Sequence, residues 1–212
     1  MKTYTLVIAL MISANQLVAQ WSPTPEQEKK FWEDTEKQEI TNYLKKHPDT
    51  NDLSEVKRKS IFLKLINQYR SQKGLTSVEY TSALDSACSL HTLYMVKYDT
   101  IGHLERYLSL DGGFYPNPYN RIKKFDSLWV KAHPYYLENC ASVGTIGNDP
   151  TVRFKRITAE SVTEIMNSWK NSPGHNAAML DPKVKYIGFF TKSKYQKRKN
   201  NFYIASTLLL SN

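Results

Sequence analysis

Apolar residues recur at helical spacing in three separate stretches of the chain. The first lies between Ser54 and Gly74, and the glycine suits the end of a helix. The second covers about 82–98, and the third begins near Thr158, a good N-terminal capping residue. The apolar stripe of the second helix is Leu84, Ala87, Cys88, His91 and Met95. The pattern therefore predicts three amphipathic helices.

Strand-like runs occupy the C-terminal part of the chain. Apolar residues dominate 186–191 and 202–210, and a basic loop joins the two runs, which predicts a β-hairpin. A further strand-like run, CASVGTIG, follows Glu138. Helices that pack on an antiparallel sheet give an α+β fold or a three-layer α/β/α sandwich. Between helices and strands, residues 106–136 are rich in aromatics, glycine and proline, and we expect an irregular, functional loop there.

The N-terminus divides into two further segments. Residues 1–20 place Lys2 before a short apolar run and then small and polar residues, which is the layout of a cleaved signal peptide. Residues 21–54 form a charged extension with weak helical character, so the folded domain is expected over 55–212. No other apolar run is long enough to cross a bilayer. We therefore expect a secreted or periplasmic protein without a transmembrane anchor.

The chain carries a net charge of +9, which favours anionic polymers and lipid head groups as partners. No nucleic-acid-binding module is recognisable, so we expect an anionic envelope component rather than a specific nucleic acid. The chain has two cysteines, Cys88 and Cys140. In an exported protein such a pair predicts one disulfide bond, and the alternative is two buried free thiols.

The most informative stretch is 167–188, NSWKNSPGHNAAMLDPKVKYIG. Ser172 suits the N-cap and Pro173 the first helical position, so His175 falls in the first turn of a short helix. The positive end of a helix disfavours an imidazolium, so we expect a neutral His175 that can bind a ligand. The alternative is a surface helix that carries a histidine by chance.

Two histidines and one glutamate are candidates for a shared site. His103, Glu138 and His175 come from distant segments, and two imidazoles with one carboxylate suit zinc or another divalent cation. His91 lies on the apolar stripe and is expected to be a hydrogen-bonded core residue. The sequence has no G-x-S-x-G, H-E-x-x-H, P-loop or G-x-G-x-x-G motif. Cys140 beside a histidine could act as a nucleophile, although pairing with Cys88 is the simpler expectation.

Several segments resemble, in order, the CAP superfamily of cysteine-rich secretory, antigen 5 and pathogenesis-related 1 proteins, in its compact bacterial SCP-like form. The similar segments span about 56–210 and are INQYRSQKGL at 66–75, ACSLHTLYM at 87–95, GH at 102–103, DGG and PYNRIKK within 111–124, ENCAS at 138–142 and SWKNSPGHNAAMLDPKVKYIG at 168–188. The combination of the WxxSPGHxxxML pattern with an upstream Glu-Asn pair is the most specific part. The extension at 21–54 lies outside the resemblance.

The resemblance implies a three-layer α-β-α sandwich whose central cavity is lined by His103, Glu138 and His175. Many members add a second glutamate on or after the third helix. Here no glutamate stands between Trp169 and Ser172, which implies a three-residue site completed by water. Members of the family are associated with sterol or lipid binding, divalent metals, signalling and, in a few cases, proteolysis.

Three functions are consistent with these observations. The first is an exported, non-catalytic binding protein with a lipid-like or envelope ligand, contacted by Tyr115, Tyr119, Trp129 and Asn139. The second is a metal-dependent peptidase or esterase with Glu138 as ligand or general base. The third is a surface-interaction module that acts through its basic face. The absence of a second glutamate favours the first.

Overall fold

The computed structural model describes residues 53–146, 156–196 and 201–212, with Thr24, Glu26, Lys30, Asp34 and Gln38 before them. The chain divides into two compact units, 1–48 and 49–212. The predicted signal peptide at 1–20 lies outside the described residues, and so does most of the extension at 21–54. Within the part of the chain that is described, no helix has the length and apolar character needed to span a membrane.

The predicted helices and strands are present, together with additional short elements. In chain order these are α3 (Glu55–Ser71), β1 (Glu79–Tyr80), α4 (Ser82–Tyr98), α5 (Pro118–Phe125), α6 (Ser127–Ala132), β2 (Tyr136–Ile146), α7 (Ala159–Lys170), α8 (Pro173–Met179), β3 (Tyr186–Gln196) and β4 (Asn201–Ser211). Gly74 has a positive φ of 71° just after α3, and Thr158 caps α7, as expected. Ser172 is the N-cap of α8, although its side chain makes no capping hydrogen bond.

The stretch at 106–136, expected to be irregular, contains two short helices. The side chain of Asn117 accepts a hydrogen bond from the Asn120 amide, and Pro118 occupies the first turn of α5. Asp126 then caps α6 by accepting from the amides of Leu128 and Trp129. These caps start helices too short to show helical periodicity in the sequence. The long loop that remains runs from Asp99 to Asn117.

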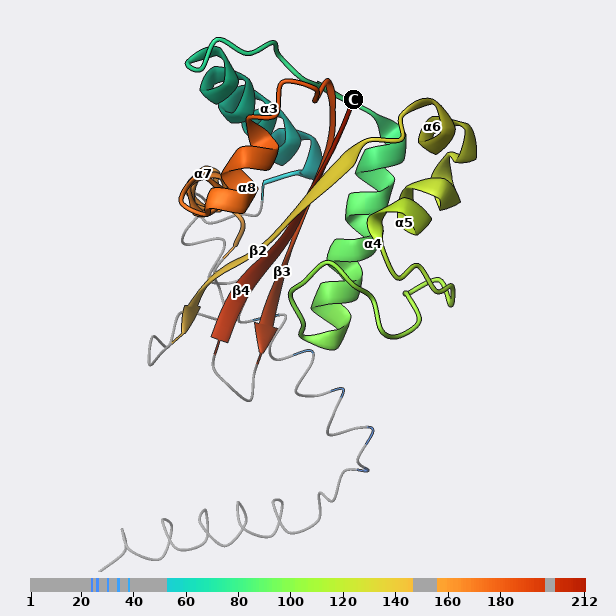
Figure 1. Cartoon of the computed structure of the whole chain (residues 1–212). Helices are drawn as coiled ribbons and strands as arrows, with labels where there is room; N and C mark the ends of the chain where they lie inside the picture. The colour runs from blue at the N-terminus through green and yellow to red at the C-terminus, as the bar shows by residue number, and fades with distance from the viewer. Residues whose placement is uncertain are drawn as a thin grey trace, which may run out of the picture. The chain divides into compact units, whose positions relative to one another are not determined.

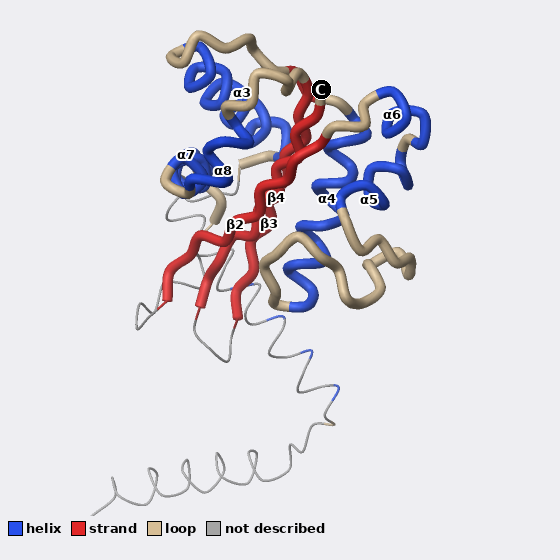
Figure 2. The backbone as a smooth tube through the Cα atoms, in the orientation of Figure 1, coloured by secondary structure: helices blue, strands red, loops and turns tan. Residues whose placement is uncertain are grey.

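The strands form one four-stranded sheet in the order β1-β3-β4-β2. β3 and β4 form the predicted antiparallel hairpin, β2 pairs antiparallel with β4, and only the short β1 is parallel to its neighbour. Figures 1 and 2 show α3, α7 and α8 on one face of the sheet and α4, α5 and α6 on the other. The three-layer α-β-α sandwich is therefore confirmed.

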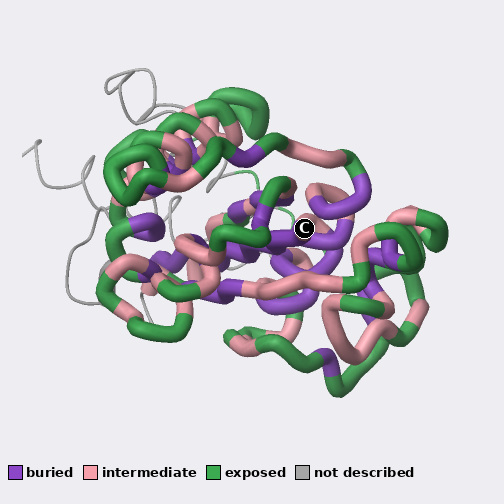
Figure 3. Tube along the Cα trace, turned by 45° about the horizontal axis from the view of Figure 1, so that its top comes forward, coloured by how far each residue is buried: buried purple, intermediate pink, exposed green. Residues whose placement is uncertain are grey.

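The core lies on both faces of the central strand β4. Leu208 and Leu210 join the cluster with α3 and α7, whereas Leu209 faces α4. Figure 3 shows that buried segments gather in the middle of the domain, with exposed segments around them. Because β4 is covered on both faces, its apolar run is nearly continuous rather than alternating.

The helix α4 packs directly on β3 at Gly188. A Cβ atom at this glycine would lie 2.2 Å from the backbone carbon of Leu84, so no larger residue fits without moving the helix. At the same point the Cys88 thiol donates a hydrogen bond to the Gly188 carbonyl over 3.1 Å. Close approach of helix and strand therefore fixes where the α4 side chains meet the sheet.

The predicted disulfide bond is not formed. Cys88 and Cys140 are both free and buried. Cys88 lies on α4 and packs with Leu84 and Leu209, whereas Cys140 lies on β2 and packs with Tyr94 and Met95.

Candidate functional site

The candidate site lies at the edge strand β2, where side chains from both helical layers meet. Glu138 and Cys140 point to the α4 side, because Cys140 packs with Tyr94 and Met95 of that helix. Asn139 points to the other side, where its amide donates to the backbone carbonyl of His175 over 3.0 Å. Successive side chains of β2 point to opposite faces of the sheet, so this strand contacts both helical layers at the candidate site.

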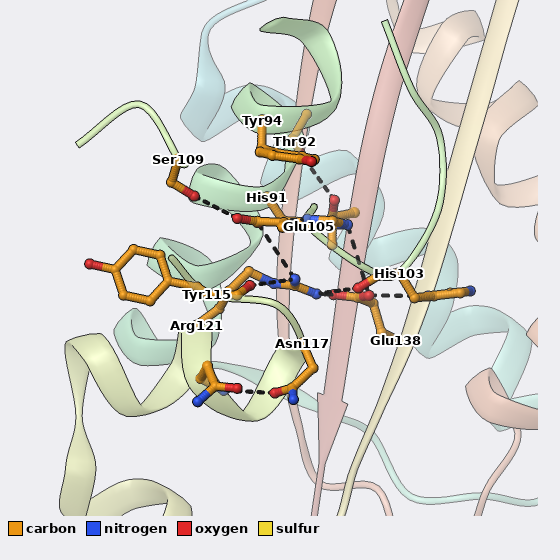
Figure 4. Close-up of polar contacts among 12 residues, drawn as sticks. His91, Thr92, Tyr94, His103, Glu105, Ser109, Tyr115, Asn117, Arg121 and Glu138 are labelled. Atoms are coloured by element: carbon orange, nitrogen blue, oxygen red, sulfur yellow. Dashed lines mark hydrogen bonds and ion pairs between the residues drawn. The ribbon is translucent and has the colours of Figure 1, made fainter. Parts of the chain in front are cut away.

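A network of buried charges supports Glu138 (Figure 4). Arg121 of α5 donates to Glu138 Oε2 over 2.5 Å and lies 3.5 Å from Glu105 Oε1. Glu105 in turn bonds His91 Nδ1 over 2.9 Å and accepts from the Ser109 hydroxyl over 2.5 Å. The side chains of His91, Glu105 and Arg121 are fully buried, and that of Glu138 is 3% exposed.

The members of this network pair with one another. His91 Nε2 faces the Gly102 carbonyl at 2.7 Å and Nδ1 faces the Glu105 carboxylate at 2.9 Å, so an acceptor lies beside each ring nitrogen. The Arg121 guanidinium lies between the carboxylates of Glu105 and Glu138. Charges without such partners are very costly to bury, so we expect the four groups to act as one unit.

Sequence reasoning missed Glu105 and Arg121. Charged residues on a loop and a short helix are usually exposed, and no spacing rule marks these two as buried. Arg121 lies within the PYNRIKK segment that resembles the CAP family, but the sequence pattern does not identify a partner for it.

The second glutamate that many family members carry is not replaced by an acidic residue of α7. Glu160 and Glu164, the acidic residues on α7, are both exposed. The second carboxylate of the region therefore comes from the loop after α4. His91 is the hydrogen-bonded core residue that was expected.

The structure brings His103, Glu138 and His175 together. His103 Nδ1 is 3.0 Å from Glu138 Oε1, and the ring centroids of His103 and His175 are 6.4 Å apart. The His103 side chain is 50% exposed. Glu138 sits beneath it, so the two imidazoles form the rim of the site and the carboxylate forms its floor.

The three groups have shifted pKa values. The hydrogen bond that His103 donates to Glu138 raises the pKa of His103 above its ordinary value, against the opposing effect of burial. Burial, followed by the nearby His103, lowers the pKa of His175. This agrees with the expected neutral imidazole, although the structure traces it to burial and a neighbouring histidine rather than to the helix terminus. Burial alone would raise the pKa of Glu138, but His103 and Arg121 outweigh it and the pKa is lowered.

The remaining predicted site residues have other contacts. Tyr115 bonds Asp111 and Lys124 through its hydroxyl. The Tyr119 ring lies near Tyr136, and Trp129 stacks on His133 at 4.0 Å. None of the contacts described for these three rings reaches His103, Glu138 or His175. Asn139 is buried and holds the backbone of His175.

Cys140 lies close to the histidine at the rim. Its sulfur is 3.7 Å from His103 Nδ1, and the donor atoms of His91, Glu138 and Cys140 all lie within 4.8 Å of one another. Both nitrogens of His91 are engaged, so this trio cannot ligate a metal without breaking the buried network. Burial raises the pKa of the Cys140 thiol, which disfavours the thiolate that a nucleophile needs.

Fold and sequence together define the class of this protein. The model of the cysteine-rich secretory protein (CAP) family matches residues 63–206, most of the described domain. The chain belongs to this family, as the resemblance of its motifs indicated.

Two solved structures share the fold. An outer surface protein from Borrelia burgdorferi is 19% identical with a TM-score of 0.51, and the match covers 77% of this chain and 98% of that one. An extracellular protein containing an SCP domain from Bacillus anthracis is 15% identical with a TM-score of 0.51. That match covers 74% of this chain but only 41% of the Bacillus protein. No curated protein matches the sequence.

Proposed function

We propose that this CAP protein is an exported, non-catalytic binding protein whose His103 and His175 hold a divalent cation such as zinc. The single observation that carries the proposal is the state of Glu138. Both of its oxygens are engaged, one with His103 and one with Arg121. The carboxylate therefore orients a histidine and is not free to act on a substrate.

The donor chemistry fits zinc or a similar ion. A carboxylate that binds Nδ1 of a histidine fixes the ring and leaves Nε2 for a metal, as is common around zinc. Two imidazoles that share one zinc ion at about 2 Å have ring centroids roughly 5 to 6 Å apart. The 6.4 Å between His103 and His175 is close to this separation. Open positions would be filled by water, which suits weak binding.

The hydrolase alternative is disfavoured by the same geometry. A general base needs a free oxygen and a pKa near the working pH. Glu138 has a lowered pKa, and hydrogen bonds occupy its oxygens, so it would be a weak base. Glu105 is fully buried and paired with His91.

Export is proposed from the pattern at the N-terminus and from the descriptions of two proteins with a similar fold. The Borrelia protein is described as an outer surface protein and the Bacillus protein as extracellular. The ligand we propose is a lipid-like molecule or an anionic envelope component, consistent with the net charge of +9.

Export is tested by N-terminal sequencing of exported material. The mature sequence should begin near Gln20 or Trp21, and retention of Met1 would contradict export by a cleaved signal peptide.

The cation site is tested by calorimetric titration with zinc. The wild type should show one weak site, and His103→Ala combined with His175→Ala should abolish it. His133→Ala is the matched control, because this histidine stacks on Trp129 and bonds the Asn212 carbonyl instead. Wild-type affinity in the double variant would refute the assignment.

The absence of hydrolysis is tested with peptide and ester panels in the presence of zinc. The wild type should show no metal-dependent turnover. Zinc-dependent turnover that disappears in Glu138→Gln, with the variant shown to be folded, would establish the hydrolase instead.

A further inference from the structure

The loop between α4 and α5 reverses the usual distribution of polar and apolar side chains. Glu105 and Ser109 are each 2% exposed, whereas Tyr107, Leu108 and Phe114 are 59%, 55% and 54% exposed. Leu110 is 51% exposed as well. Soluble proteins rarely gather large apolar side chains on the surface in this way without a partner.

Hydrogen bonds hold the backbone of this loop in place. The Tyr94 hydroxyl accepts from the amides of Arg106 and Tyr107, at 2.8 and 3.2 Å. The Tyr98 hydroxyl donates to the Leu108 carbonyl over 2.8 Å, and Ser109 bonds the buried Glu105. Figure 1 shows the loop running from the C-terminal end of α4 towards α5. The apolar side chains are therefore displayed by an anchored backbone.

These side chains share one hollow with two cations. Tyr107, Leu108, Leu110 and Phe114 line a groove of about 600 Å³, together with Lys97 and Arg106. We call these six residues the apolar-basic patch.

The charge of the patch is positive because nearby acids are already paired. Asp99 pairs with Lys194, and Asp111 pairs with Lys124. In the described part of the chain, neither Lys97 nor Arg106 has an ion-pair partner within 4 Å. The surface thus combines exposed apolar groups with unneutralised cations.

We propose that the apolar-basic patch docks the protein on an anionic lipid bilayer. Apolar side chains enter the boundary between head groups and acyl chains, and cations beside them meet anionic head groups. A second copy of the chain fits less well, because a symmetric contact would bring the same cations face to face. The inference rests on the proposed binding role, for which it names the surface and the partner, but it does not depend on the histidine pair.

Vesicle co-sedimentation of the full exported chain tests the inference, with phosphatidylcholine vesicles that contain or lack phosphatidylglycerol. We expect binding to the anionic vesicles that weakens in high salt. Leu110→Ser with Phe114→Ser should reduce the affinity roughly tenfold or more. Lys97→Gln with Arg106→Gln should reduce it about fivefold for each cation.

The matched control is Leu128→Ser with Lys131→Gln on α6, where Leu128 is 73% exposed. This variant should bind the anionic vesicles as the wild type does. Equal wild-type binding to neutral and anionic vesicles, or unchanged binding by the patch variants, would overturn the inference. So would a wild-type dimer in analytical ultracentrifugation that the patch variants lose.

Zinc titration of the same variants separates this inference from the proposed cation site. Patch variants should keep the wild-type zinc affinity. If the His103 and His175 variant keeps zinc binding while the vesicle results hold, the cation assignment fails and the membrane surface stands.

Discussion

At the scale of single residues, Glu138 acts on the site through His103. It accepts from His103 Nδ1 at 3.0 Å, and Arg121 holds its other oxygen. This arrangement favours the protonated form of His103, whereas burial disfavours the protonated form of His175. The pKa values of the two imidazoles at the rim are therefore shifted in opposite directions.

Histidine titration by NMR should show this difference. The pKa of His103 should lie above about 6.5 and that of His175 below it.

Stability and zinc affinity should also depend on pH through His103. Because its pKa is raised in the folded state, His103 contributes fully to stability below about pH 6.5, and this contribution is lost as the pH rises through the folded-state pKa. Zinc affinity should rise over the same window, because protons compete for the ring. Glu138→Gln should lower the pKa of His103, and an unchanged pKa would exclude the hydrogen bond as its cause.

Arg121→Leu should strongly destabilise the domain. The change leaves Glu105 and Glu138 buried without their shared cation, which costs about 3 to 5 kcal/mol in comparable buried pairs. Chemical denaturation gives the free energy of unfolding. The exposed Lys123→Leu, on the same helix, should change it by less than about 0.5 kcal/mol. Equal effects from both variants would show that the network contributes nothing to stability.

At the scale of elements, two close contacts position the site. Arg70 of α3 is fully buried and donates to the carbonyls of Met179, Asp181 and Val184, which ties the end of α8 to α3. Gly188 lets α4 approach β3. The first contact places His175, and the second places the helix that leads to His103.

Gly188→Ala should destabilise the protein by about 1 to 3 kcal/mol, because the new methyl group overlaps the backbone of α4. Thermal and chemical unfolding measure the loss. Gly174→Ala is the control, since a Cβ atom there meets nothing within 4 Å. A Gly188→Ala protein as stable as the control would mean that helix and strand separate without cost.

At the scale of the whole molecule, the hydrophobic core holds the fold without a cross-link. Cys88 and Cys140 are free thiols and belong to different apolar clusters. Stability must then come from the packing of both helical layers on β4.

Thiol labelling under denaturing conditions without reductant should therefore modify both cysteines of the exported protein. Labelling of the native protein should be slow, because both thiols are buried. Recovery of no free thiol after denaturation would show that the disulfide forms after all.

Local chemistry in the sequence was enough to predict much of this protein. Helical periodicity located α3, α4 and α7, the Ser-Pro-Gly-His turn located α8, and apolar runs located the β3–β4 hairpin. These features depend on neighbours along the chain, so a single sequence carries them. Family resemblance supplied the grouping of His103, Glu138 and His175, which spacing alone could not establish.

Tertiary structure decided the rest. The packing of α4 on the sheet puts Cys88 and Cys140 in different apolar clusters, and no local pattern in the sequence encodes such long-range neighbours. The burial of Glu105 and Arg121 depends on a loop and a helix that meet Glu138 across the sheet edge. The same loop buries the polar side chains of Glu105 and Ser109. Its apolar side chains, Tyr107, Leu108, Leu110 and Phe114, are therefore left exposed. Each depends on contacts between residues far apart in the chain, so only the folded arrangement determines them.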